Sequence, residues 1–334
     1  MLKRILSVLL AILFLIVAFY FWGSSGSLSK DNYTKITTYD TKSGQAPDDT
    51  LTAVTYNIGY LSGMTNNLAV EHSEELYTKN LKDAINLFSI LQPDIVGFQE
   101  IDFNSSRSFN IDQLKEISQA CGFEHAAMAV NWDKKYVPFP YGLPNVHFGK
   151  ILSGQAISSK HTILENKSNK LEKVASNPFY YNAFYLDRLA QVAKIEIGEK
   201  TVIVINVHLE AFVTETRENQ AKALLEMYRS YANDYPVLLI GDFNSRPPYA
   251  SEPTENDKTI GLFSKEANLK SAISEATYLA NEHEFFTFDS VNPIEKIDFI
   301  FYNFDKIRPV SARVIKEAGE ISDHLPVQFK FVIR

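Results

Sequence analysis

The sequence predicts an α/β protein in which β-sheets pack face to face with helices outside them, behind one N-terminal apolar helix. Apolar, strand-like runs alternate with amphipathic, helix-like segments from Leu51 onward. The alternation fills residues 50–334, which is enough chain for one large domain. With 45% hydrophobic and 22% charged residues, the composition is that of a globular protein.

Before this domain lies an uncharged apolar run, Ile5–Trp22, preceded by Lys3 and Arg4. It is long enough to cross a bilayer as a helix, and its aromatic end suits a membrane interface. A signal peptide begins in the same way but has a shorter apolar core and a small-residue cleavage site. We therefore interpret residues 1–22 as a single-pass membrane anchor; the alternative is a cleaved signal peptide and a secreted protein. The two basic residues favour an extracytoplasmic domain.

Residues 23–49 are rich in Ser, Thr, Gly and Asp, which predicts a flexible linker between the membrane and the domain. The chain has a single cysteine, Cys121, which excludes an internal disulfide and favours a packing role for that residue. The formal net charge is −7, without any block of Lys or Arg. This charge argues against long nucleic acids as partners, and we expect a monomer.

The first elements of the domain are two strands with a helix between them. The strands are expected at Leu51–Asn57 and Ile95–Phe98, the second running into Gln99 and Glu100. The helix is expected at Ser73–Leu91, ended by Pro93. Its apolar face has helical spacing: Leu81, Ile85, Phe88 and Leu91. The same spacing marks a second helix at Ile111, Leu114, Ile117 and Cys121, closed by Gly122.

The middle of the chain, Phe123–Asp187, is aromatic-rich and yields no clear elements. After it, Leu189–Ile197 and Thr201–Glu210 predict a hairpin that turns at Gly198. A helix is expected at Thr214–Ala232, with an apolar face of Ala221, Leu224, Leu225 and Tyr228. The remaining strands are expected at Pro236–Ile240, Lys296–Tyr302, Val310–Val314 and Val327–Val332.

Carboxylate, amide and imidazole side chains recur at the ends of these strands. They are Asn57, Glu100, Asn206, His208, Asp242, Asn244 and Asp298, with Asp323 and His324 just before the last strand. One such residue is an ordinary turn feature. Six strands with polar tips instead indicate a shared cleft, because buried charges need a metal or each other.

These residue types also indicate a reaction class. Oxygen ligands without cysteine favour Mg²⁺, with Mn²⁺ or Ca²⁺ as alternatives, whereas zinc prefers more His or Cys. The sequence contains no H-E-x-x-H motif, no phosphate loop, no G-x-S-x-G elbow and no G-x-G-x-x-G fingerprint. The pattern therefore favours metal-assisted attack of water on a phosphate ester.

In this context five motifs resemble those of the endonuclease/exonuclease/phosphatase superfamily, which includes DNase-like nucleases, sphingomyelinases and inositol-phosphate phosphatases. The motifs are TYN at Asn57, QE at Glu100, NVHLE around His208, GDFNS from Gly241 and SDHLPV from Ser322. The resemblance runs from Leu51 to the C-terminus. It implies a four-layer α/β sandwich of two mixed β-sheets flanked by helices, and a Mg²⁺-dependent hydrolase acting as a phosphodiesterase.

The resemblance also implies roles for individual residues. Glu100, Asn57 and Asp323 match the metal-binding positions. Asp242 matches the residue that orients or deprotonates the attacking water, and His324 matches the imidazole that contacts the phosphate. Three further matches are implied: Asp298 fixes the His324 tautomer, His208 stabilises the transition state or protonates the leaving group, and Asn244, with Asn206, binds phosphate oxygens. The other histidines, His72, His125, His147, His161 and His283, are expected to be surface or packing residues.

The substrate is expected to depend on loops, where two aromatic clusters stand out. They are Trp132, Tyr136, Phe139 and Tyr141, and Phe179, Tyr180, Tyr181, Phe184 and Tyr185. Each is either a satellite core under long loops or a wall for a lipid or sugar substrate or a membrane surface. With the anchor and the acidic charge, this favours a membrane lipid or lipid-linked head group as substrate. A membrane-attached nuclease and an inactive binding protein with the same fold are the alternatives.

Overall fold

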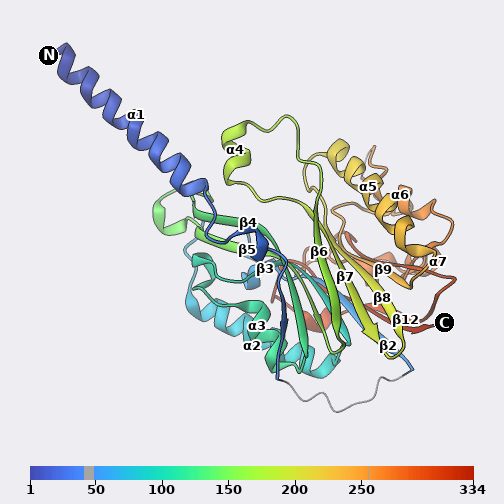
Figure 1. Ribbon diagram of the computed structural model, residues 1–334. Helices are drawn as coiled ribbons and strands as arrows, with labels where there is room; N and C mark the ends of the chain where they lie inside the picture. The colour runs from blue at the N-terminus through green and yellow to red at the C-terminus, as the bar shows by residue number, and fades with distance from the viewer. Residues whose placement is uncertain (41–48, 255) are drawn as a thin grey trace.

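The computed structural model describes residues 1–40, 49–254 and 256–334, and it confirms a four-layer sandwich of two mixed sheets flanked by helices (Figure 1). The first sheet has the order β1-β4-β5-β3-β2-β13-β12. Its strands are β1 (Ile36–Thr38), β2 (Leu51–Asn57), β3 (Ile95–Asp102), β4 (His125–Val137), β5 (Gly149–Ser159), β12 (Ile307–Val314) and β13 (Val327–Ile333).

The second sheet has the order β10-β11-β9-β8-β7-β6. Its strands are β6 (Ile163–Lys170), β7 (Leu189–Ile197), β8 (Lys200–His208), β9 (Val237–Asp242), β10 (Leu269–Ser271) and β11 (Asp298–Asn303). The helices are α1 (Leu2–Ser24), α2 (Glu74–Leu91), α3 (Gln113–Ala120), α4 (Phe179–Phe184), α5 (Thr214–Ala232), α6 (Thr259–Ser264) and α7 (Glu275–Ala280). Short 3₁₀ turns lie at Lys30–Asn32, Gly59–Leu61, Ser106–Ser108, Pro144–Val146, Glu282–Phe285 and Lys316–Ala318.

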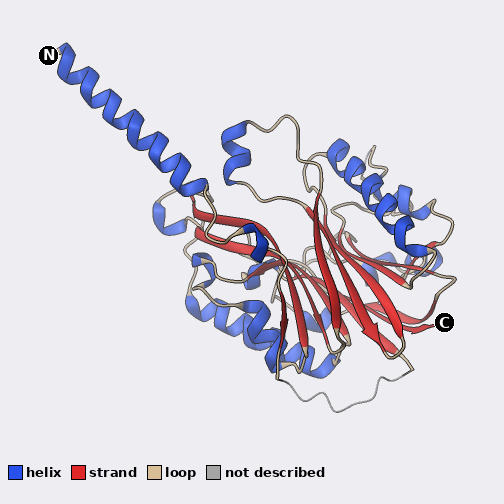
Figure 2. Ribbon diagram, in the orientation of Figure 1, coloured by secondary structure: helices blue, strands red, loops and turns tan. Residues whose placement is uncertain are grey.

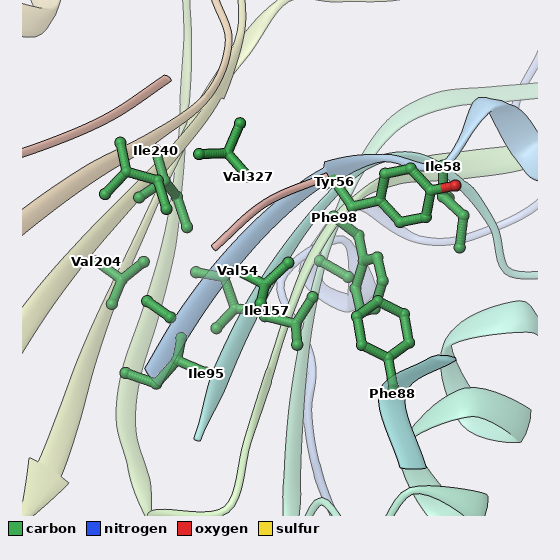
Figure 3. Close-up of a cluster of buried hydrophobic side chains, with 14 of the residues drawn as sticks. Val54, Tyr56, Ile58, Phe88, Ile95, Phe98, Ile157, Val204, Ile240 and Val327 are labelled. Atoms are coloured by element: carbon green, nitrogen blue, oxygen red, sulfur yellow. The ribbon is translucent and has the colours of Figure 1, made fainter. Parts of the chain in front are cut away.

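Helices cover the outer faces of the two sheets (Figure 2). On the first sheet, Phe88 of α2 packs edge-on against Tyr56 and Phe98, with ring centroids 6.4 and 5.5 Å away (Figure 3). On the second sheet, Leu224 of α5 and Phe263 of α6 are buried in one cluster with the strands beneath them. Burial of these apolar side chains supplies most of the stabilisation of a sandwich of this kind.

The two sheets approach each other closely at Gly97 of β3. A Cβ atom at this position would lie 2.5 Å from Cδ1 of Ile240 in β9 and 3.3 Å from Cγ of Asn206 in β8. Glycine leaves room for both side chains, whereas any larger residue would require the Ile240 side chain or one sheet to shift. The sequence run IVGF is therefore a strand whose glycine serves the contact between sheets.

The direction of the strands brings their polar tips to one edge. β2 and β3 are parallel, as are β8 and β9, so their carboxyl ends lie together within each sheet. β11 is antiparallel to β9 and β13 is antiparallel to β2, so these two strands begin where their partners end. Residues at the ends of the first four strands and at the starts of the last two therefore share one edge of the sandwich.

The first part of residues 23–49, the segment predicted as a flexible linker, instead has defined structure and contacts the domain. Helix α1 extends to Ser24, and the carboxylate of Asp133 in β4 then accepts hydrogen bonds from the backbone amides of Ser27 and Leu28 at 2.8 and 2.9 Å. Ile36–Thr38 pairs with β4 as an edge strand. Polar composition predicted a tether here, but backbone hydrogen bonds to the sheet do not require apolar side chains. Residues 41–48 lie outside the described residues.

Helix α1 is the single helix, among the described residues, with the length and apolar composition of a membrane span. None of the residues in its apolar window is buried, although rings near its end contact the domain. Length and composition alone fit both a membrane anchor and a signal sequence.

Candidate active site

The predicted catalytic side chains face the space between the two sheets. Along β9, Leu238 and Ile240 point into the core shared by both sheets, and Asp242 continues the same alternation to the strand end. His208 follows Val204 in the same way on β8. The side chains therefore lie at the edge of the core, held by β9, which is buried throughout, and by the buried part of β8 from Val202 onward.

Asp242 lies at the centre of the group. The side-chain amide of Asn57 donates a hydrogen bond of 3.0 Å to its Oδ2, and Nε2 of His208 lies 3.5 Å from the same oxygen. Nε2 of His324 is 3.8 Å away. The register pairs His208 directly with Asp242 across β8 and β9. Residues from both sheets thus converge on one carboxylate.

His324 is oriented by a second carboxylate. Its Nδ1 lies 2.9 Å from Oδ2 of Asp298, which is buried at the start of β11. The ring of Phe288 packs against the imidazole with centroids 5.0 Å apart. The Asp298 contact makes Nδ1 the hydrogen-bond donor and leaves Nε2 directed at Asp242 and the cleft. This is the arrangement expected for the two residues from the sequence.

Glu100 and Asp323 form a second acidic pair. The side-chain amide of Asn66 donates to Oε2 of Glu100 at 2.9 Å and lies 3.4 Å from Oδ2 of Asp323. Glu100 has a positive φ of 52°, at the point where the pairing of β3 with β5 shifts by one residue. Such a bulge turns a side chain out of the strand alternation, and here it accompanies the carboxylate at the cleft.

The GDFN turn follows from the close contact of β8 and β9. At Gly241, with φ of 146°, a Cβ atom would lie 2.0 Å from the carbonyl oxygen of Val207. Asn244 adopts a φ of 49°, its backbone amide donates to Oδ1 of Asp242 at 2.8 Å, and its side-chain amide donates to the carbonyl of Leu209. Asn244 is therefore held rigidly beside the central carboxylate.

Asn206 is placed differently from the expectation. Its side-chain amide donates to the carbonyls of Phe98 and Ala156 at 3.0 and 3.1 Å, and its Oδ1 accepts from Gln99 at 2.6 Å. The residue is fully buried. Its polar atoms join the two sheets in the interior, so they are not directed at a phosphate, and the predicted phosphate-binding role of Asn206 is wrong.

Burial raises the pKa of both central acids. It raises the pKa of Asp242 to about 7, although the neighbouring His324 opposes the rise. Burial and the negative charge of Asp323 also raise the pKa of Glu100. Carboxylates crowded in this way without a counter-charge are costly, so the cleft favours the binding of a cation or a proton.

The pKa values of the two imidazoles, His324 and His208, are shifted in opposite directions. Burial would lower the pKa of His324, but Asp298 and Asp242 raise it well above its ordinary value. Burial and the positive charges of Arg188 and His324 lower the pKa of His208 well below its ordinary value. The two shifts favour a protonated His324 and a neutral His208, which suits different roles in proton transfer.

Glu100 and Asp323 are candidate ligands for a divalent cation. They are two carboxylates bridged by one amide donor, with the side-chain oxygen of Asn57 in the same cleft. The donors are all oxygens, which Mg²⁺ and similar ions prefer. Two carboxylates that lie near one amide group are the observation that favours a cation at this point.

Asp242, Asp298 and His324 also lie close enough together to hold a metal, since single ligand atoms from the three are within 4.8 Å of one another. We interpret them instead as an imidazole between two acids, hydrogen-bonded to Asp298 at 2.9 Å and 3.8 Å from Asp242. The Nδ1 of His324 already bonds Asp298, so it cannot also bind a metal.

Sequence reasoning missed two polar residues at the cleft. Asn66 bridges the acidic pair from the loop after β2, in a segment without any recognisable motif.

The second missed residue, Arg188, precedes β7, whose first residues lie beside the end of β8. It is buried, and its Nε and Nη1 make no hydrogen bond within the described part of the chain. Its nearest carboxylate, that of Glu210, is 3.8 Å from Nε. A signal for Arg188 was its position at the start of a strand antiparallel to β8.

A polar cavity of about 440 Å³ adjoins the site at Asn244. Arg217, Arg246 and Glu295 contribute charged side chains to its wall. Arg246 is bound to Glu295 at 2.6 Å, and Arg217 to Asp257 at 2.8 Å. The cavity suits a hydrophilic group attached to the reacting phosphate.

The remaining histidines have contacts outside this cleft. His147 bonds the hydroxyl of Tyr136, His125 contacts Thr38, and His161 lies 3.6 Å from Asp94. His72 and His283 pack against aromatic rings, those of Tyr77 and Phe286. These contacts agree with the expected packing and surface roles.

With this geometry in view, comparisons with known proteins give a consistent result. The model of the Endonuclease/Exonuclease/phosphatase family matches residues 54–324. None of the curated proteins compared with the sequence matches it.

Solved structures share the fold at low sequence identity. An endonuclease/exonuclease/phosphatase from Beutenbergia cavernae is 18% identical with a TM-score of 0.62, over 85% of this chain and 72% of that one. A mannosyl-6-phosphatase from Bacteroides thetaiotaomicron is 16% identical with a TM-score of 0.59, over 84% and 99%. The human Nocturnin catalytic domain with bound sulfate is 15% identical with a TM-score of 0.58, over 92% and 100%. These likenesses concern the fold alone.

Proposed function

The chain belongs to the endonuclease/exonuclease/phosphatase family, whose members hydrolyse phosphate esters, and on this premise we propose that it is a Mg²⁺-dependent phosphodiesterase acting on a membrane lipid or lipid-linked head group. The observation that carries the reaction is the convergence on Asp242 of Asn57, His208 and His324 from both sheets. A carboxylate with a pKa near neutrality, beside an oriented imidazole, is suited to activating water.

The proposed mechanism assigns a role to each side chain at the cleft. Asp242 orients the attacking water and accepts its proton. Cationic His324, held by Asp298 through Nδ1, donates from Nε2 to a phosphate oxygen as negative charge builds up. His208, whose Nε2 lies 3.5 Å from Asp242, stabilises the leaving oxygen as a neutral imidazole by a hydrogen bond, and the proton that Asp242 takes from water passes to that oxygen. Asn244 binds a further phosphate oxygen.

Glu100 and Asp323, with Asn57, would hold the metal ion; Mn²⁺ or Ca²⁺ are alternatives to Mg²⁺. When bound, the ion neutralises charge on the phosphate and polarises the ester for attack. The chain's own contribution is to keep the ligands fixed, through Asn66 and the bulge at Glu100.

Two features support a lipid-linked substrate. Helix α1 has the composition of a membrane span and packs against the domain directly, so the domain would stay at the bilayer. The polar cavity beside Asn244 would take a head group next to the reacting phosphate. The acidic net charge of −7 disfavours long nucleic acids.

The decisive experiment is a substrate panel with the full chain, in Mg²⁺ and in EDTA. The panel holds sphingomyelin, phosphatidylinositol, plasmid DNA and a soluble aryl phosphodiester. We expect turnover of a lipid and of the aryl ester that EDTA abolishes. Plasmid cleavage without lipid turnover would identify a membrane-attached nuclease, and no turnover of any member would identify a binding protein.

Substitution of Asp242 tests the mechanism within that panel. We expect Asp242→Asn to lower kcat on the aryl phosphodiester by about 10²–10⁴-fold, because the amide cannot take the proton of water. Asp234→Asn, which changes an exposed acid after α5, serves as the matched control and should leave kcat unchanged. Full activity of Asp242→Asn would contradict the assigned role.

A further inference from the structure

Exposed apolar side chains gather at the inner end of α1. Phe179 and Tyr180 of α4 are 76% and 58% exposed, and Tyr141 and Leu143, between β4 and β5, are 77% and 74% exposed. We call these four residues the aromatic rim. Figure 1 shows α4 and the β4–β5 connection next to the end of α1. Single exposed apolar residues are ordinary, but a group of this kind marks a surface with a partner.

The rim is continuous with α1. The ring of Tyr20 packs edge-on against Phe179 and Phe184, with centroids 6.1 and 5.9 Å apart. Trp22 stacks on Tyr136 of β4 at 6.3 Å. The last turns of the apolar helix therefore lie on the same surface as the rim, and the two form one apolar face.

Polar contacts fix the angle between α1 and the domain. The Nζ of Lys134 donates to the carbonyl of Ser24 at 3.1 Å, and Asp133 binds the backbone of the next turn. The hydroxyl of Tyr33 also donates to Asp133, at 3.0 Å. A helix held in this way cannot enter a bilayer without bringing the rim to the bilayer surface.

The rim also leads into the catalytic cleft. Tyr181, at the middle of α4, packs against Tyr185 at a tilt, with ring centroids 4.9 Å apart. Tyr185 in turn lies near Arg188, whose charge acts on His208 and Glu100. An amphipathic substrate could therefore extend from the cleft along tyrosine rings to the rim, with its phosphate inside and its apolar part outside.

We propose that the aromatic rim lies in the interfacial region of the bilayer that α1 enters, and that it orients the catalytic cleft toward lipids in that bilayer. Tyrosine and phenylalanine suit this region, where one end of a side chain meets lipid and the other meets water. The inference deepens the proposed function and rests on it for the identity of the substrate, but the membrane contact itself does not depend on turnover.

The test uses the full chain reconstituted in phosphatidylcholine vesicles, with Cys121→Ser in every variant. Tyr180→Cys carries an environment-sensitive fluorophore, and doxyl-labelled phosphatidylcholine serves as quencher. Ile90→Cys, on the outer face of α2 and 81% exposed, is the matched control. We expect quenching at residue 180 to exceed that at residue 90 by about threefold, since interfacial side chains reach the acyl boundary. Equal quenching at the two positions would overturn the proposal.

A second measurement links the contact to catalysis. The double variant Phe179→Ser/Tyr180→Ser should hydrolyse a vesicle-embedded substrate about tenfold more slowly, because the cleft loses its orientation to the surface. Its rate on the soluble aryl phosphodiester should not change. An equal loss on both substrates would indicate a folding defect and would count against the rim. Strong quenching at residue 180 without turnover of any lipid would support the membrane contact and overturn the lipid substrate.

Discussion

At the scale of single residues, the chemical type of a side chain at a strand end predicted which residues meet at the cleft. Asp242, His208 and His324 meet as expected, because parallel strands carry their ends to one edge. Asn206 shows where such reasoning fails. Its position two residues before His208 gives it the same face, but the close approach of Gly97 buries it between the sheets. Depth within the sandwich cannot be read from alternation alone.

Among the residues that the sequence did not indicate, we expect Arg188 to contribute most to phosphate binding. Its burial suits it to donate hydrogen bonds to phosphate oxygens, as do its Nε and Nη1, which make no hydrogen bond within the described part of the chain. Arg188→Lys should lower kcat/KM on the aryl phosphodiester by about tenfold, since lysine keeps the charge but loses the planar pair of donors. Steady-state kinetics measure this, with the exposed Arg229→Lys as the unaffected control. An unchanged kcat/KM would remove Arg188 from the phosphate site.

Lys296 predicts a pH dependence of stability. Burial lowers its pKa to about 7, although Asp298 opposes the shift. Between about pH 7 and 9 the unfolded chain therefore binds the proton that the folded chain has released, so stability rises with pH, by at most about 1.4 kcal/mol per pH unit from this group. Chemical denaturation of Lys296→Met should give a shallower rise over this range. The same slope in both proteins would contradict a lowered pKa.

At the scale of elements, regular periodicity was predictable and irregular strands were not. Helices α2 and α5 lie within a residue of their expected bounds, and all four residues of the expected α5 face are buried. The segment 123–187 instead contains β4, β5, β6 and α4. Register shifts interrupt β4 at two points, which destroys its alternation, and β6 is a polar edge strand. On α2, Leu81 and Ile85 are only half-buried because Ala84 and Leu87 face the core more directly.

The contact between the sheets predicts an energetic coupling. Gly97→Ala should destabilise the protein by about 1–3 kcal/mol, because the new Cβ meets Cδ1 of Ile240. Ile240→Val alone should cost about 0.5–1.5 kcal/mol. In the double variant the valine lacks the clashing atom, so its cost should be smaller than the sum of the two. Chemical denaturation of the unaltered protein, the two single variants and the double variant measures the coupling. If the changes in unfolding free energy add up, the sheets adjust at this point without coupling the two residues.

At the scale of the whole molecule, the order of layers followed from the alternation of strands and helices, while the relation between helix α1 and the domain did not. The sequence indicated a tether because residues 23–49 are polar. Backbone pairing with β4 and the bonds to Asp133 make the described part of this segment a fixed portion of the domain. Contacts between distant segments of this kind leave no periodic signal in sequence.

Binding of a cation should stabilise the folded state as a whole. Burial and the negative charge of Asp323 raise the pKa of Glu100, and Mg²⁺ bound beside this carboxylate would favour its ionised form. We expect the Tm to rise with Mg²⁺ concentration, by the equivalent of about 2.7 kcal/mol at a hundredfold excess over Kd. Glu100→Gln should lose this rise while folding normally, whereas Glu116→Gln, on α3, should keep it. A Tm independent of Mg²⁺ in the unaltered protein would argue against the assigned ligands.

The contacts of Asp133 and Lys134 with the end of α1 would also determine how the domain meets the proposed membrane substrate. With α1 in a bilayer, the cleft stays at a constant height above the lipid and does not move freely through the surrounding solution. Encounters then occur by lateral diffusion in two dimensions. The rate should follow the surface density of substrate in the membrane rather than its bulk concentration, and dilution with inert lipid should slow the reaction where added buffer does not.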